Sequence, residues 1–226
     1  MSFLTIPEIW ELCLEKIYDE SAYVDGLTRV LDRAGINKTS KILDASCGSG
    51  FPALDLIERN YNVVVADKSG EMIQLLKSNA RKRSVPIHAE QVAWSDLAAH
   101  FGKDAFDCVL CRGNSLVYAD SWEQNWMDPE RSRSAIQVAL QNFHIVLKLG
   151  GTLYLDVTRE GEVPHTKDFG VIETAKNGHV HLTWEMRRDV QNQIRTWIVS
   201  ASFMQTGTEM EYVSYSYLFR KGELES

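Results

Sequence analysis

The sequence predicts an α/β fold, in which a doubly wound, mostly parallel sheet is followed by a small antiparallel sheet. Three observations support this. Residues 41–53, KILDASCGSGFPA, read as a short apolar strand, a glycine turn and the start of a helix. Four further apolar runs alternate with helical patterns up to about residue 160, which is typical of a parallel sheet. After Arg159 the chain changes to closely spaced strand-like runs separated by turn residues.

The elements follow in a regular order. Two amphipathic helices are expected within residues 3–34, the second over about residues 21–33. We expect the parallel strands at residues 41–44, 62–66, 87–92, 106–111 and 152–157, and helices at about 51–59, 71–82, 97–101 and 129–147. Ser69 is placed to cap the second of these later helices. The antiparallel strands are expected at 171–174, 180–188, 194–204 and 210–219, with Asn177-Gly178 as a hairpin turn.

Only residues 220–226 follow the last of these strands, so we expect any strands that close the parallel sheet to be shortened or absent. An open sheet edge can pair with another chain. We therefore hypothesise a homodimer.

Composition excludes several classes of protein. The 226 residues and 25.7 kDa suit one domain with a small lid. The formal net charge of -7 and pI of about 5.4 argue against nucleic acid or an anionic membrane as partner. Neither a signal peptide nor an apolar run of about 20 residues is present. The four cysteines form no disulfide framework, and no ligands stand at metal spacing, so a cytoplasmic protein without a metal site is expected.

The glycine turn predicts a nucleotide-binding corner. Gly48 and Gly50 allow a sharp turn and a close approach of a ligand to the backbone. Asp44 ends the first strand, where its carboxylate could order the N–H groups of the loop and face a ligand ammonium. Asp67 ends the second strand, where a carboxylate can accept hydrogen bonds from both hydroxyls of a ribose. The turn alone does not distinguish a dinucleotide from another ligand.

Five segments in this order resemble the class I S-adenosylmethionine-dependent methyltransferases, which have a Rossmann-like fold. They are LDASCGSG, VVVADKSGEMI, VAWSDL, FDCVLCRGNSLVYA and LKLGGTLYLDV, and the resemblance covers about residues 20–160. Within that class, the Cys-Arg-Gly-Asn-Ser run at 111–115 resembles the glycine N-methyltransferase-like enzymes. The resemblance implies a cofactor-binding core with the N-terminal helices at residues 1–160. Residues 161–226 would then be an antiparallel lid and the C-terminal end of the same domain.

The resemblance also implies which residues bind S-adenosylmethionine. Asp67 would bind the ribose, and Met72 would pack against the adenine, as a soft side chain suits an aromatic face. Ala93 and Trp94 would flank the edge of the adenine. The other implied positions are Tyr23, Asp44, Ala45, Cys47, Gly48, Gly50, Lys68, Cys111, Arg112 and Gly113.

The methyl acceptor is implied to be a small molecule methylated on nitrogen. Transfer is an in-line displacement at the sulfonium methyl, so the protein needs to align the acceptor and exclude water rather than supply a nucleophile. Asn114 and Tyr18 are the expected catalytic residues, and the expected acceptor-binding residues are Asn114, Ser115, Trp122 and Arg159.

One departure from the family pattern limits the choice of acceptor. The glycine-methylating members carry an arginine just beyond the fifth strand, and Arg159 stands one position later. A shift of one residue turns a strand side chain to the other face, so glycine is not assigned as the acceptor. Two alternatives stay open: an O-methyltransferase of a natural product, which would need a base or a metal, and a non-catalytic module that binds S-adenosylmethionine.

Overall fold

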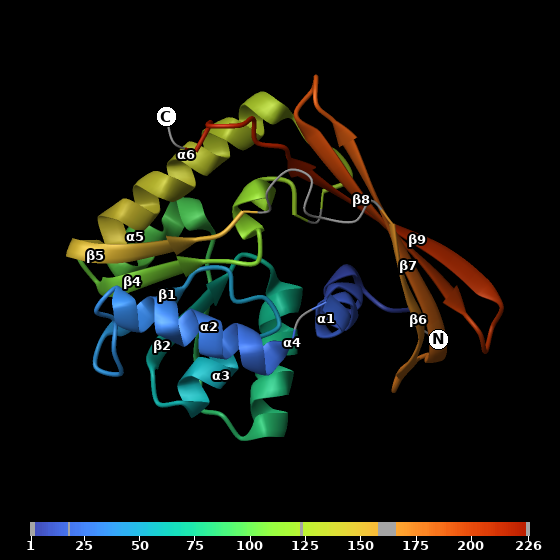
Figure 1. Cartoon of the computed structure of the whole chain (residues 1–226), viewed down its shortest axis with the longest axis horizontal. Coiled ribbons are helices and arrows are strands. Elements are labelled where there is room, and N and C mark those ends of the chain that lie inside the picture. Colours follow the sequence, from blue (N-terminus) through green and yellow to red (C-terminus); the bar gives the residue numbers. More distant parts are fainter. Residues whose placement is uncertain (1–2, 18, 123, 158–165, 225–226) are drawn as a thin grey trace. The chain divides into compact units, whose positions relative to one another are not determined.

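The computed structural model describes residues 3–17, 19–122, 124–157 and 166–224. The chain divides into two compact units (Figure 1). The core unit comprises residues 10–115 and 137–156. The sheet unit comprises residues 1–9, 116–136 and 157–226.

The core unit is built on a five-stranded parallel sheet, as predicted. Its strands are β1 Lys41–Asp44, β2 Asn62–Asp67, β3 His88–Gln91, β4 Phe106–Cys111 and β5 Leu147–Leu155. They lie in the order β3-β2-β1-β4-β5, and every neighbouring pair is parallel. The order reverses between β1 and β4, which is the switch point where ligands bind in such sheets.

The helices agree with the expected pattern to within a few residues. They are α1 Ile6–Ile17, α2 Glu20–Arg33, α3 Ala53–Glu58, α4 Gly70–Arg83, α5 Leu97–Phe101 and α6 Pro129–Val146, with single 3₁₀ turns η1 Trp94–Asp96 and η2 Ser115–Tyr118. The Ser69 hydroxyl caps α4 by accepting the Met72 N–H at 3.2 Å, as its position predicts.

β5 begins earlier than predicted. The sequence predicted a strand at 152–157 after a glycine turn, whereas the structure starts β5 at Leu147, which pairs with Phe106 of β4. The register then shifts before Cys108, whose partner is Thr152. A bulge therefore absorbs the residues in between, including both glycines, and keeps them within the strand.

The interior of the core unit explains why its strands are so apolar. β1 and β4 lie inside the sheet and are covered on both faces, and Ile42, Leu43, Val109 and Leu110 are completely buried. Helices α2, α3 and α4 contribute their apolar sides to the same core, including Leu27, Leu54 and Leu76.

The sheet unit contains a four-stranded antiparallel sheet, also as predicted. Its strands are β6 Thr166–Thr174, β7 Gly178–Asp189, β8 Ile194–Phe203 and β9 Thr208–Tyr217, in the order β6-β7-β8-β9. The predicted hairpin at Asn177-Gly178 is confirmed: Thr174 pairs with Gly178, whose φ is +62°. Within the described ranges, β9 pairs with β8 alone, and β5 remains an edge strand of the parallel sheet.

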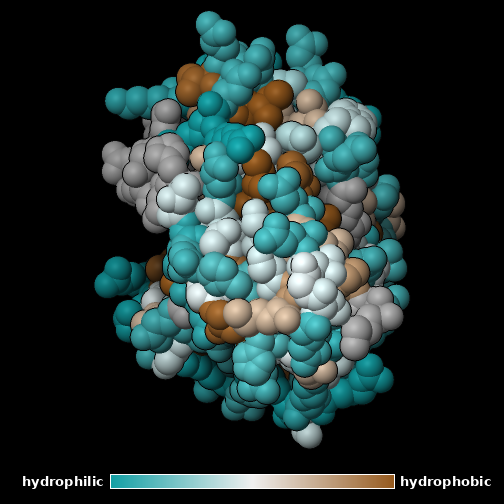
Figure 2. All heavy atoms as spheres, turned by 90° about the vertical axis from the view of Figure 1, so that its right-hand side faces the viewer, coloured by the Kyte–Doolittle hydropathy of each residue, from teal (hydrophilic) through white to brown (hydrophobic). Residues whose placement is uncertain are grey.

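The antiparallel sheet has one buried face, which the alternating pattern of its strands defines. On β7 this face carries Val180, Leu182 and Met186, and their partners on β8 are Phe203, Ala201 and Trp197. The side of the molecule seen in Figure 2 is largely hydrophilic, with separate apolar patches. None of the described helices combines the length and the apolar composition needed to cross a membrane.

Candidate functional site

Three aspartates mark the carboxyl ends of strands in the core unit. Asp44 is the last residue of β1, Asp67 is the last residue of β2, and Asp156 directly follows β5. Carboxyl ends of parallel strands meet at one edge of the sheet, where the crevice at the switch point opens. The candidate site is therefore built from the loops at this edge, and each aspartate organises one of them.

Asp67 organises the loops after β1 and β2. Its Oδ2 accepts the Gly48 N–H and its Oδ1 accepts the Ser69 N–H, both at 2.9 Å. Burial raises the pKa of this carboxyl to about 6, although both hydrogen bonds act in the opposite direction. An ionised carboxylate has about four acceptor positions, so two remain for the hydroxyls of a ribose.

Two glycines leave space at the ends of adjacent strands. Gly48, after β1, has a φ of +51°, and a Cβ added there would meet only the Met72 Sδ, at 3.9 Å. Gly113, after β4, has a φ of +67°, and a Cβ there would meet nothing within 4 Å. A ligand can approach the backbone closely at both positions. This cradle, with Met72 beside it, fits the sulfonium and adenosyl parts of S-adenosylmethionine.

Gly50 has a different reason to be glycine. Its φ is +119°, and an added Cβ would lie 2.8 Å from Leu54 of α3 and from Leu76 of α4. The missing side chain therefore allows both helices to pack against the turn. Gly50 therefore serves the packing of the core, and its contact with the cofactor stays a prediction.

Trp94 joins the loop after β3 to the end of β1. Its indole N–H donates to the Ala45 carbonyl at 2.5 Å, and its ring packs edge-on against Phe143 of α6 at 5.5 Å. Ala93 and Trp94 are both half-buried, as is Lys68 in the loop after β2. These contacts bring together the expected residues Ala45 and Trp94, which lie 49 positions apart in the sequence.

The Asp44 carboxylate forms a buried ion pair with Arg112. Its Oδ2 lies 3.1 Å from the Arg112 Nε, and the two residues are 0% and 6% exposed. Asp44 also accepts the Ser46 N–H at 3.2 Å, so it orders the loop as expected. Burial raises the pKa of Asp44, and Arg112 partly opposes this.

This pair changes one expectation drawn from the sequence. The Asp44 carboxylate faces the Arg112 guanidinium, whereas we expected it to face a ligand ammonium. The Arg112 side chain also donates through Nη2 to the Phe51 carbonyl. The sequence could not reveal the pairing, because the two residues lie 68 positions apart.

Cys47 and Cys111 contribute backbone rather than thiols. Both side chains are fully buried, and burial raises their pKa values well above the ordinary range. The Cys47 N–H donates to the Ala66 carbonyl at 3.1 Å, which ties the turn to β2. Neither thiol has the thiolate character of a nucleophile.

Asp156 organises the loop after β4, although it was not among the site residues predicted from the sequence. Its Oδ1 accepts the Asn114 N–H at 2.7 Å, and its Oδ2 accepts the Tyr23 hydroxyl at 3.4 Å. Asn114 has a φ of +60°, an uncommon conformation that this contact stabilises. The Ser115 hydroxyl donates to the Arg112 carbonyl at 2.6 Å, which closes the turn. The signal that could have identified Asp156 is its place after a strand, which it shares with Asp44 and Asp67.

Three residues remain from the predicted catalytic and acceptor-binding sets: Trp122, Tyr18 and Arg159. Trp122 belongs to the sheet unit, where its ring packs edge-on against Tyr118 at 5.5 Å. Tyr18 and Arg159 are outside the described residues. In the described ranges, no three His, Cys, Asp or Glu side chains converge as metal ligands.

Comparison with known proteins shows which proteins the chain resembles. Residues 42–151 match the family model of a methyltransferase domain. The chain is 31% identical over 147 residues to a glycine/sarcosine N-methyltransferase of Parasynechococcus marenigrum, an alignment covering 65% of this chain and 47% of that protein. It is 27% identical over 155 residues to the glycine N-methyltransferase of Rattus norvegicus, covering 66% and 50% respectively. The chain thus spans about half the length of these relatives.

Solved structures share the fold. The sugar N-methyltransferase KedS8 from Streptoalloteichus has a TM-score of 0.70 at 20% identity, covering 99% of this chain and 83% of that one. The S-adenosylmethionine-bound amino pentose methyltransferase CalS10 from Micromonospora echinaspora has a TM-score of 0.69 at 15% identity, covering 100% and 88%. The matching domain model and the shared fold thus make the chain similar to the S-adenosylmethionine-dependent methyltransferases.

Proposed function

We propose that this protein transfers a methyl group from S-adenosylmethionine to a nitrogen atom of a small molecule. The observation that carries the proposal is the arrangement at the switch point. The open backbone at Gly48 and Gly113 lies at the ends of adjacent strands β1 and β4, and the Asp67 carboxylate ends β2 beside them. The choice of nitrogen rests on the similar proteins that are glycine or glycine/sarcosine N-methyltransferases.

Different residues would bind the cofactor and orient the methyl acceptor. Asp67 would hold the ribose, while Gly48 and Gly113 would let the cofactor approach the backbone. S-adenosylmethionine supplies the electrophilic methyl group and the leaving group when it is bound. Asn114, held in its conformation by Asp156, would orient an acceptor at the end of β4. Because the buried thiols of Cys47 and Cys111 hold their protons, the acceptor itself must bring the attacking lone pair.

Titration calorimetry with S-adenosylhomocysteine tests the cofactor site. Asp67→Asn should weaken binding by roughly 10- to 100-fold, the equivalent of about 1.5–3 kcal/mol for hydrogen bonds to a charged group. Asp107→Asn is the matched control. Asp107 accepts the Lys41 N–H at 2.7 Å near the start of β1, at the opposite edge of the sheet, so this variant should bind like the wild type.

The transfer itself is tested with methyl-labelled S-adenosylmethionine and a panel of small amines and small hydroxyl compounds. Labelled methylamine products support the proposal. Equal S-adenosylhomocysteine binding by wild type and Asp67→Asn would show that the ribose assignment is wrong. Cofactor binding without transfer to any amine would favour the non-catalytic alternative, and transfer to hydroxyl acceptors alone would favour the O-methyltransferase.

A further inference from the structure

Within the part of the chain that the structure describes, the sheet unit holds a buried arginine that has no carboxylate partner. Arg195 of β8 is 6% exposed and lies on the buried face of the antiparallel sheet. Its Nε donates to the Ser216 hydroxyl at 2.8 Å, and its guanidinium lies 5.9 Å from the centre of the Tyr118 ring. Among the described residues it forms no ion pair. A buried charge is costly unless a charge of opposite sign accompanies it.

A second arginine lies directly opposite. Arg188 of β7 is the cross-strand partner of Arg195, so both side chains are on the same face of the sheet. Arg188 is half-buried, and it too forms no ion pair within the described ranges. Like charges that face each other across two strands destabilise a sheet. An anion bound between the two guanidinium groups would attract both of them and so offset their mutual repulsion.

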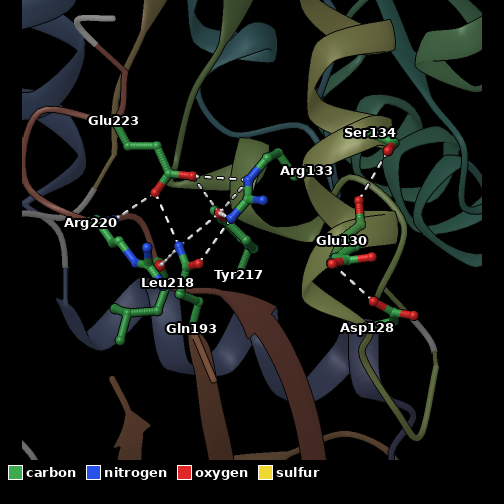
Figure 3. Close-up of polar contacts among 9 residues, drawn as sticks. All are labelled: Asp128, Glu130, Arg133, Ser134, Gln193, Tyr217, Leu218, Arg220 and Glu223. Carbon is green, nitrogen blue, oxygen red and sulfur yellow. Dashed lines mark hydrogen bonds and ion pairs between the residues drawn. The ribbon is translucent and has the colours of Figure 1, made fainter. Parts of the chain in front are cut away.

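Two other arginines of this unit, Arg187 and Arg133, have carboxylate partners. On the opposite face of β7, Arg187 forms a two-point contact with Glu185, at 2.7 and 3.0 Å. Arg133 of α6 donates to Glu223, Gln193 and the Tyr217 hydroxyl, a network drawn in Figure 3. Its guanidinium lies 5.9 Å from the Tyr217 ring, the same distance as Arg195 from the Tyr118 ring. The two arginine–tyrosine pairs differ in one respect. Arg133 has a carboxylate partner, Glu223, whereas Arg195 has none among the described residues.

We propose that the guanidinium groups of Arg195 and Arg188 bind a small oxyanion. Guanidinium groups bind carboxylate and phosphate through paired N–H donors, and the Arg195 Nη atoms remain for this after Nε bonds to Ser216. The ligand is then a small molecule that carries a carboxylate or a phosphate. The anion site stands on the contacts of the sheet unit alone.

The test uses thermal unfolding of the full chain in pyrophosphate or acetate against chloride at the same ionic strength. At ten times the dissociation constant, the anion should raise Tm of the wild type by about 3–5 °C. Arg195→Met should abolish this rise, and Arg195→Lys should keep part of it. Arg133→Met, the matched control, should keep the full rise. A rise with pyrophosphate alone identifies a phosphorylated ligand, and a rise with acetate alone identifies a carboxylate.

A second readout distinguishes an anion site from a structural role. Without added anion, Arg195→Met should leave Tm unchanged or raise it, because methionine removes an uncompensated buried charge. Arg133→Met should lower Tm, because it removes the hydrogen bonds of Arg133 to Glu223, Gln193 and the Tyr217 hydroxyl. The proposal is overturned if neither anion raises Tm of the wild type at 50 mM, or if the rise is the same in Arg195→Met. S-adenosylhomocysteine should stabilise wild type and Arg195→Met equally, so a failure of cofactor binding would be seen separately.

Discussion

The buried ion pair between Arg112 and Asp44 supports a quantitative prediction. Replacing Arg112 with methionine keeps most of the side-chain volume but leaves the Asp44 carboxylate, which is 0% exposed, without its counter-ion. Breaking a buried pair in this way typically costs about 3–5 kcal/mol. For a protein of this size, 1 kcal/mol shifts Tm by about 2–4 °C, so we expect Tm to fall by about 10 °C.

The Arg59–Asp25 pair is the matched control. Its charged atoms are closer, at 2.6 Å against 3.1 Å, but its side chains are 39% and 50% exposed. Exposed pairs contribute about 0–1 kcal/mol, so Arg59→Met should lower Tm by at most about 4 °C. The comparison separates burial from distance as the factor that sets the strength of an ion pair.

The pH dependence of Arg112→Met gives an independent check. The pKa of Asp44 is already raised by burial in the wild type, and losing Arg112 removes an influence that lowers it. The Asp44 carboxyl of the folded variant then holds its proton more tightly than the same carboxyl in the unfolded chain. The stability of the variant therefore falls as pH rises above the pKa that Asp44 has in the unfolded chain. Its deficit in Tm relative to wild type should therefore be larger at pH 8 than at pH 5.

Thermal unfolding at both pH values measures these effects, and Asp44→Asn/Arg112→Met should lose the pH-dependent part of the deficit. The reasoning is refuted if Arg112→Met is no less stable than Arg59→Met. It is also refuted if its deficit is the same at pH 5 and pH 8.

Two further predictions concern the loops at the same edge of the sheet. The affinity for S-adenosylhomocysteine should fall about tenfold between pH 7.5 and pH 5, since the pKa of Asp67 is about 6 and its ionised form accepts the ribose hydroxyls. Calorimetry at both pH values measures this, and an unchanged affinity would contradict it. Gly50→Ala should cost roughly 3 kcal/mol, because the new methyl group meets Leu54 and Leu76 at 2.8 Å. Gly26→Ala, within α2 and with only Arg29 Nη2 nearby at 3.9 Å, should instead stabilise by about 0.5–1 kcal/mol. Urea unfolding compares the two, and equal effects would refute the packing argument.

The strand pattern made the fold predictable. Short β-branched runs such as NVVVA can be buried only within a sheet, and the alternation with helices requires parallel connections. The change to closely spaced runs after Arg159 similarly indicated antiparallel strands, and the Asn177-Gly178 turn set one hairpin. The start of β5 was missed, because the bulge that extends the strand depends on its pairing with β4.

Local chemistry also made part of the candidate site predictable. The cap at Ser69 and the place of Asp67 at the end of β2 follow from neighbouring residues alone. Gly48 and Gly50 are only two positions apart and look equivalent in the sequence. They differ in the structure, because Leu54 and Leu76 crowd one position and leave the other open.

The sequence by itself thus determined which residues stand at strand ends, because periodicity and turn chemistry act over a few neighbouring positions. The tertiary structure decided which charges meet. Asp44 has Arg112 as its partner and Asp156 holds Asn114, across 68 and 42 positions of sequence, while Arg195 has no carboxylate among the described residues. Such pairings depend on strand order and burial, since the cost of an uncompensated charge arises only after folding has removed it from water.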